Sequence, residues 1–183
     1  DTYLNTASAV QYTGAQDAAG TAAATLTLTG NDGSGEVTFG AVNIDITAVN
    51  DAPVMTGLQS VSFAENTVNA APQLLDADVT FTDAEGNFDG GHLSLSGLLA
   101  EDTVSVNDQG TGAGEIGFDG TDVTYGNVVI GTLAGGNAGA DLTITFNAAA
   151  SSEAVDALIQ TLTYANSSDA PTTSRDLVLN VTD

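Results

Sequence analysis

The residues with the clearest chemical potential are the acidic ones in the run Asp-Ala-Glu-Gly-Asn-Phe-Asp-Gly-Gly at positions 83–91. Here Asp83, Glu85, Asn87 and Asp89 place an oxygen-bearing side chain at every second position. Calcium takes six to eight oxygen ligands, and short loops of alternating acidic and amide residues, with glycines for tight curvature, supply several at once. The loop is therefore a candidate calcium site, and a solvated acidic turn is the alternative interpretation.

The loop does not follow the EF-hand pattern. Its glycine is not at the sixth position, and Ser94 stands where an EF-hand has its bidentate glutamate. The flanking residues also have the alternation of strands rather than the period of helices.

A second set of oxygen ligands occurs at the joint formed by Asn50, Asp51, Ala52 and Pro53. Apolar and polar residues alternate on both sides of it, so the joint connects two predicted strands. Pro53 lacks a backbone donor and favours an extended conformation in the residue before it, which stiffens the connection. A calcium-binding linker at residues 50–53 is one interpretation, and a plain Asx turn before a proline is the other.

The charge balance bears on both candidate sites. The chain has 24 Asp and Glu residues against one basic residue, Arg175, and a formal net charge of -23. Self-repulsion of this size opposes compaction. Because 42% of the residues are hydrophobic, often at alternating positions, the composition indicates a folded protein that needs bound cations and not a disordered acidic tail.

The same composition excludes several classes of partner. Nucleic acids and anionic membrane surfaces are bound through clusters of Lys and Arg, which this chain lacks, and no apolar run is long enough to insert into a membrane. With no cysteine there is no disulfide or thiolate metal site. The start of the sequence has neither a basic nor an apolar leader region, so we expect an interior piece of a longer protein.

Catalysis is not expected either. Carboxylate pairs are abundant, but a single arginine and a single histidine leave few groups to stabilise a developing negative charge. We therefore predict that the protein is not an enzyme.

Short alternating segments separated by Gly, Asn and Asp predict an all-β fold, an antiparallel β-sandwich. Hairpin tips are expected at the glycine-rich residues 110–114 and 135–139. The candidate strands after the joint are residues 58–64, 79–82, 93–96, 103–106, 115–118, 123–125, 128–132, 142–146, 162–165 and 176–181.

One segment has a helical period. Val155, Leu158, Ile159 and Leu162 follow the i, i+3, i+4, i+7 spacing, and Ser151 or Ser152 can cap the N-terminus. We expect one short helix per module at residues 153–160, with residues 1–4 as the remnant of the same helix in a preceding module.

The two ends of the chain resemble each other. The matching positions are Val10, Tyr12, Asp17 and Ala18 with Leu162, Tyr164, Asp169 and Ala170, and then Leu26, Leu28 and Asp32 with Leu177, Leu179 and Asp183. This order indicates a repeat of about 150 residues. Residues 1–49 are then the C-terminal part of one sandwich repeat, and residues 54–183 form the next repeat, without the last strand that residues 37–47 supply to the first.

Three motifs together resemble the cadherin-like, Ig-like tandem repeats of giant bacterial RTX-type adhesins. Residues 50–53 are similar to the Asn-Asp-x-Pro linker of these modules, Glu65-Asn66 to the Glu-Asn of the first strand, and residues 82–87 to the acidic run after a later strand. The resemblance implies that Asp51, Glu65, Asp83 and Glu85 converge around calcium. The linker is shorter than in animal cadherins, so one or two ions are expected.

The resemblance implies a function as well. We expect a calcium-rigidified extender repeat of a large secreted or cell-surface bacterial protein that serves adhesion, biofilm formation or filament assembly. A β-sandwich module that binds carbohydrate or protein is the alternative. The expected partners are neighbouring repeats of the same protein, including strand donation between chains.

Overall fold

The computed structural model describes residues 11–16 and 18–183 and divides the chain between Asn50 and Asp51 into two units. The first unit comprises residues 1–50 and the second residues 51–183. The helix remnant expected at residues 1–4, and positions 10 and 17 of the repeat comparison, lie outside the described residues.

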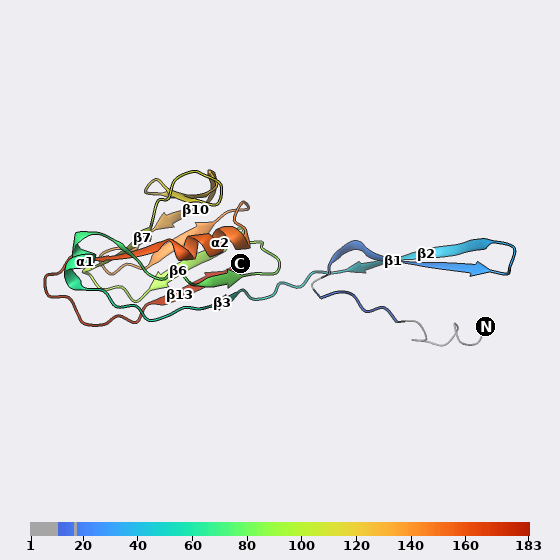
Figure 1. Ribbon diagram of the computed structural model, residues 1–183, viewed down its shortest axis with the longest axis horizontal. Helices are drawn as coiled ribbons and strands as arrows, with labels where there is room; N and C mark the ends of the chain where they lie inside the picture. The colour runs from blue at the N-terminus through green and yellow to red at the C-terminus, as the bar shows by residue number, and fades with distance from the viewer. Residues whose placement is uncertain (1–10, 17) are drawn as a thin grey trace. The chain divides into compact units, whose positions relative to one another are not determined.

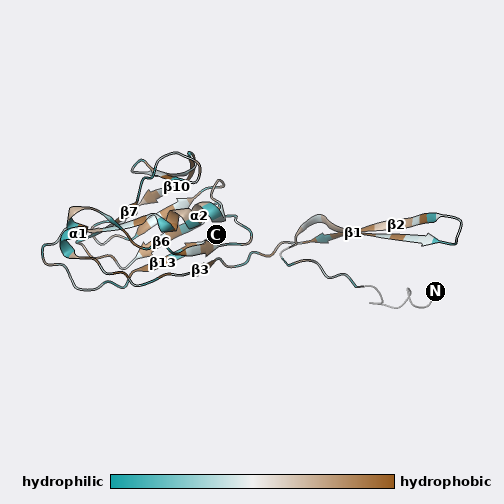
Figure 2. Cartoon of the chain, in the orientation of Figure 1, coloured by the Kyte–Doolittle hydropathy of each residue, from teal (hydrophilic) through white to brown (hydrophobic). Residues whose placement is uncertain are grey.

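The first unit contains an antiparallel hairpin of β1 (Gly20–Asn31) and β2 (Glu36–Ile46) (Figure 1). Its turn is closed by Asn31, whose side-chain oxygen accepts a hydrogen bond from the Gly33 N–H at 2.7 Å. Gly33 and Gly35 both have positive φ angles, of 99° and 143°, which favour glycine. The two strands alternate apolar and polar residues, and Figure 2 shows apolar positions on both. The hairpin therefore has one apolar face.

The second unit is an antiparallel β-sandwich, as predicted. The larger sheet has the order β13-β6-β11-β10-β9-β8 and the smaller one the order β4-β12-β7, while β3 pairs with β5. The large sheet consists of β6 (His92–Ser96), β8 (Ile116–Phe118), β9 (Asp122–Tyr125), β10 (Val128–Ala134), β11 (Leu142–Phe146) and β13 (Val178–Thr182). The remaining strands are β3 (Val54–Thr56), β4 (Gln73–Leu74), β5 (Thr80–Thr82), β7 (Asp102–Val106) and β12 (Leu162–Asn166).

The core lies between the two sheets, and the strands β6, β7 and β11 each bury every second side chain there. Leu93 and Leu95 of β6 and Ile144 of β11 come from the large sheet, and Val104 of β7 and Leu162 of β12 from the small one; none is more than 2% exposed. Burial of apolar side chains at about 25 cal/mol per Å² is the main favourable contribution to folding. The alternation in the sequence thus specifies which face of each strand enters the core.

Two helices complete the second unit: α1 (Glu65–Ala70) and α2 (Ser152–Gln160). The predicted helix at residues 153–160 is α2, and it begins one residue earlier than expected. It packs on β5, where the Asp156 Oδ1 accepts a hydrogen bond from the Phe81 N–H at 2.6 Å. Neither helix is long and apolar enough to cross a membrane, and the described residues contain no other helix.

The expectation of a single helix, with a strand at residues 58–64, is wrong. Gly57 has a φ of 84°, which ends β3, and residues 57–64 form neither helix nor strand. The chain then enters α1 at Glu65, and Val68 turns into the core with an exposure of 5%. The alternation at residues 61–65 was therefore not sufficient to predict a strand, because a strand also needs a neighbouring strand to hydrogen-bond with.

The other candidate strands are confirmed, with ends that differ by at most two residues. Of the two predicted hairpin tips, residues 135–139 do connect β10 to β11. Residues 110–114 instead connect β7 of the small sheet to β8 of the large sheet, so this hairpin prediction is wrong. Glycine-rich turns mark where the chain changes direction, but not which sheet the next strand joins.

Candidate functional site

The acidic loop and the joint are brought together by the pairing of β3 with β5. Val54 lies opposite Thr82 in this antiparallel ladder. When the same register is continued outward, Asp51 lies opposite Glu85. The structure shows this contact, since the Asp51 N–H donates a hydrogen bond to the Glu85 Oε2 at 3.2 Å. The register of β3 with β5 therefore makes two of the predicted ligands, Asp51 and Glu85, neighbours.

Among the candidate calcium ligands of the loop, Asp83 has the side chain best positioned to bind an ion. Its Oδ1 accepts a hydrogen bond from the Gly86 N–H at 2.5 Å, and Gly86 makes the tight turn with a φ of 61°. Its Oδ2 is buried and has no hydrogen-bond partner. Burial of a carboxylate oxygen without a hydrogen-bond partner costs free energy, so we expect a ligand from outside the chain at this atom.

The second half of the loop is anchored by Phe88, which is fully buried. Its ring contacts Phe81 and Phe146, with ring centroids 5.9 and 5.8 Å apart. Asn87 and Asp89 flank this anchor, and both are exposed. Their side chains therefore lie at the surface.

The structure does not bring Glu65 to this loop. Glu65 is the first residue of α1, and α1 lies at the end of the second unit opposite to β3 (Figure 1). The ligand set implied by the cadherin resemblance is therefore reduced to Asp51, Asp83 and Glu85 within this unit. Asn50 is exposed and is the last residue of the first unit.

As the side chains stand, the part of the chain that the structure describes has no group of three or more Asp, Glu, His or Cys residues arranged to hold a metal ion. Asp51 is exposed and Glu85 is half-buried, so rotation of these two side chains would be required. Such rotamer changes are fast for exposed side chains. The residues fit a calcium ion by type and by the unpartnered oxygen of Asp83, but they are not arranged around one.

Helix α2 begins beside the acidic loop and fixes its position. The Ser152 Oγ accepts a hydrogen bond from the Asp83 N–H at 2.9 Å. Further along α2, Gln160 Nε2 donates to the Val79 O at 2.9 Å. The loop and β5 are thus held by one side of the helix. The partial positive charge of the helix N-terminus also favours the acidic residues there.

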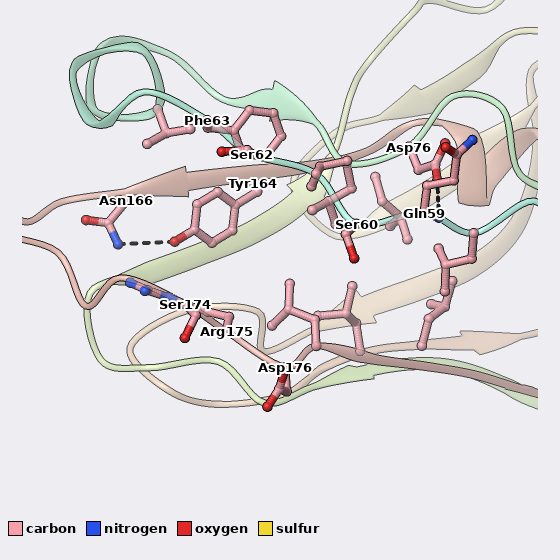
Figure 3. A pocket seen from close by; sticks show the side chains of 18 of the residues that line it. Gln59, Ser60, Ser62, Phe63, Asp76, Tyr164, Asn166, Ser174, Arg175 and Asp176 are labelled. Atoms are coloured by element: carbon pink, nitrogen blue, oxygen red, sulfur yellow. Dashed lines mark hydrogen bonds between the residues drawn. The ribbon is translucent and has the colours of Figure 1, made fainter.

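A second feature of the unit is a groove of about 790 Å³, called the core groove below (Figure 3). Residues 58–63 line one side and residues 171–177 the other, and the groove reaches the core residues Leu95 and Leu162. The Gln59 N–H donates to the Asp76 Oδ2 at 2.9 Å. The ring of Phe63 stacks on Tyr164 with centroids 6.1 Å apart.

At one end of the core groove lies a buried polar cluster that sequence reasoning missed. Asp102 is 1% exposed, and its carboxylate accepts hydrogen bonds from Arg175 Nε, Asn166 Nδ2 and the Leu99 N–H, all between 2.7 and 2.9 Å. The Tyr164 hydroxyl donates to the same carboxylate at 2.6 Å. Arg175 also forms an ion pair with Glu101. The sole basic residue of the sequence was the signal that could have predicted a buried ion pair.

The cluster keeps Asp102 ionised. Burial by itself would raise the pKa of Asp102, but the hydrogen bonds from Arg175, Tyr164 and the Leu99 N–H outweigh it and hold that pKa below its usual value. Burial and the hydrogen bond to Asp102 raise the pKa of Tyr164. The cluster ties residues 171–177 to β7 and has a structural role.

Comparison of the chain with protein-family models, with curated proteins and with solved structures finds no match in any of the three.

Proposed function

We propose that residues 51–183 form a calcium-stabilised structural repeat, in which Asp51, Asp83 and Glu85 bind the ion. The observation that carries the proposal is the buried Oδ2 of Asp83, which has no hydrogen-bond partner. It lies in a loop whose Glu85 side chain already contacts the Asp51 backbone. A calcium ion would give this oxygen a partner and offset the repulsion between the three carboxylates.

Calcium is favoured over magnesium by the kind of ligands available. Calcium accepts irregular sets of carboxylate and carbonyl oxygens, whereas magnesium demands near-ideal octahedral geometry. The loop offers side chains of different lengths and the carbonyls of a tight turn. The net charge of -23 adds a general attraction for cations, which a test has to separate from specific binding.

The wider role that we propose is an extender repeat of a large extracellular bacterial adhesin. Its motifs at residues 50–53 and 82–87 resemble those of cadherin-like repeats. Asp51 follows directly on the first unit, so an ion bound there would restrict the backbone where the two units join. A repeat that stiffens on binding extracellular calcium suits an extended surface protein.

Thermal unfolding during a calcium titration tests the proposed site. A ligand that binds the native state alone stabilises it by RT ln(1 + [L]/Kd), which is about 2.7 kcal/mol at a hundredfold excess over Kd. We expect calcium to raise the melting temperature, EDTA to reverse the rise, and magnesium to have a smaller effect. Sodium chloride at matched ionic strength measures general screening.

Asp83→Asn is the decisive variant because it removes the charge and retains the shape of the side chain. We expect it to abolish most of the calcium-induced rise. Asp141→Asn makes the same change of net charge at an exposed residue of the β10–β11 turn and should leave the rise intact. A rise that sodium chloride reproduces, or that both variants reduce equally, would show charge screening and contradict the proposal.

A further inference from the structure

The large sheet of the second unit ends in a strand with one free side. β13 is the last strand in the sheet order and pairs with β6 only, among the residues that the structure describes. The core groove lies beside it, since Leu177 and Leu179 contribute to its lining. Across the groove, residues 58–63 belong to no sheet. Edge strands of this kind are templates for an added strand.

The lining of the core groove suits a β-strand with an apolar face. Leu58 and Val61 on one side are 56% and 47% exposed. The groove leads from them to the buried side chains of Val79 and Ile159. An added strand would bury this apolar surface and pair its backbone with β13.

The hairpin of the first unit has an apolar face that stays exposed among the described residues of that unit. Leu26 and Leu28 of β1 and Val42 of β2 are all more than 50% exposed. Phe39 is 69% exposed, and its ring lies over Gly30 on the same face. An isolated two-stranded hairpin is marginally stable in water, so opening it costs little.

The internal repeat relates these two features. Leu26 and Leu28 of β1 correspond to Leu177 and Leu179 at β13. In the repeat, β13 corresponds to β1, and β1 pairs with β2. The sequence of β2 is therefore suited to pair with β13. We propose that the core groove binds residues 36–46 of a second copy of this chain, antiparallel to β13 and in the register that β2 makes with β1.

This register is specific and agrees with the burial of β13. In the hairpin, Thr27 lies opposite Ala41 and Thr29 opposite Thr38. With the offset of the repeat, Val178 faces Ala41 and Asn180 faces Thr38 of the second copy. Val178 and Asn180 are both exposed, whereas Leu179 between them is half-buried and lines the groove. The donated strand therefore places its apolar side chains toward the core. Exchange of an element between identical chains is a low-cost route to association.

Disulfide trapping tests the register, because the chain contains no cysteine of its own. Four single variants of the full chain are required: Thr38→Cys, Ala41→Cys, Val178→Cys and Asn180→Cys. Facing residues of an antiparallel pair have Cα atoms about 4.5–5.5 Å apart, within the range of a disulfide. A shift of two residues separates them by about 8 Å, which exceeds that range.

Variants are mixed in pairs under mild oxidation at moderate salt, which screens the repulsion between two chains of charge -23. We expect disulfide-linked heterodimers from Asn180→Cys with Thr38→Cys and from Val178→Cys with Ala41→Cys. The swapped mixtures, Asn180→Cys with Ala41→Cys and Val178→Cys with Thr38→Cys, are the matched controls and should give about tenfold less. Calcium is omitted in one series, so that failure of the proposed calcium site does not affect the outcome.

Three outcomes would overturn the proposal. The first is the absence of heterodimers in both in-register mixtures. The second is an equal yield in all four mixtures, which indicates random collision. The third concerns the double variant Thr38→Cys/Asn180→Cys: if it forms only a disulfide within one chain while the mixtures form none, the strand comes from the same chain. Unchanged circular dichroism of each variant shows that the exposed substitutions leave the fold intact.

Discussion

At the residue scale, the fold of the second unit depends on the charge of Arg175. The Arg175 guanidinium and the Asp102 carboxylate form an ion pair in the interior, with side-chain exposures of 9% and 0%. Burial of two ions is costly, and their attraction and hydrogen bonds offset that cost only while both are present. Removal of one partner therefore costs far more than the pair itself contributes.

Arg175→Met should lower the free energy of unfolding by about 3–5 kcal/mol, because Asp102 is then buried without its partner. Urea denaturation followed by circular dichroism measures this loss. Glu101→Gln is the matched control, since the Glu101 side chain is 21% exposed and the loss of its ion pair with Arg175 should cost much less than the loss of the buried pair. Equal losses for the two variants would contradict the structural role assigned to Asp102.

At the element scale, two adjacent serines at the start of helix α2 have different roles, one in the helix and one in the acidic loop. The Ser151 Oγ accepts a hydrogen bond from the Ala154 N–H at 3.2 Å and caps the helix. The Ser152 Oγ instead accepts from the Asp83 N–H. The sequence predicted that either serine could be the cap, and the structure assigns that role to Ser151.

The two serines should separate helix stability from the calcium response. Ser151→Ala should cost about 1 kcal/mol of unfolding free energy, with or without calcium, because it removes an N-cap. Ser152→Ala should instead reduce the calcium-induced rise in melting temperature, because the Asp83 backbone loses its anchor. This second expectation rests on the proposed calcium site. It is refuted if Ser152→Ala has the full calcium response while Asp83→Asn has lost it.

At the scale of the whole molecule, acid acts in two opposite ways. Protonation of carboxylates reduces the net charge of -23 and so relieves self-repulsion, which favours folding. It also discharges Asp102, whose pKa is held low in the native state by Arg175, Tyr164 and Leu99 against the effect of burial. Because the native pKa is the lower one, this stabilisation is complete above the unfolded value of about 3.9 and is lost as the pH falls through the native pKa.

Comparison of the wild type with Asp102→Asn separates the two effects. We expect the difference in unfolding free energy between them to be constant from pH 7 to about pH 5 and to shrink below about pH 4. Self-repulsion is nearly the same in both proteins and cancels in the difference. Urea denaturation at a series of pH values measures it. A difference that stays constant down to pH 2 would show that Asp102 does not carry the low pKa.

The sequence by itself determined the all-β class, the strands from residue 79 onward and helix α2, because these depend on periodic burial along one segment. The motif resemblance also placed Asp51 near Glu85, and their hydrogen bond follows from the register of β3 with β5. The tertiary structure decided what depends on distant neighbours. It placed Glu65 at the opposite end of the unit, made residues 58–63 one side of the core groove, and paired Asp102 with Arg175 across 73 positions of the chain. Alternation states which side chains prefer burial, but a strand forms only where another backbone offers hydrogen bonds, and a charge is buried only where its partner meets it.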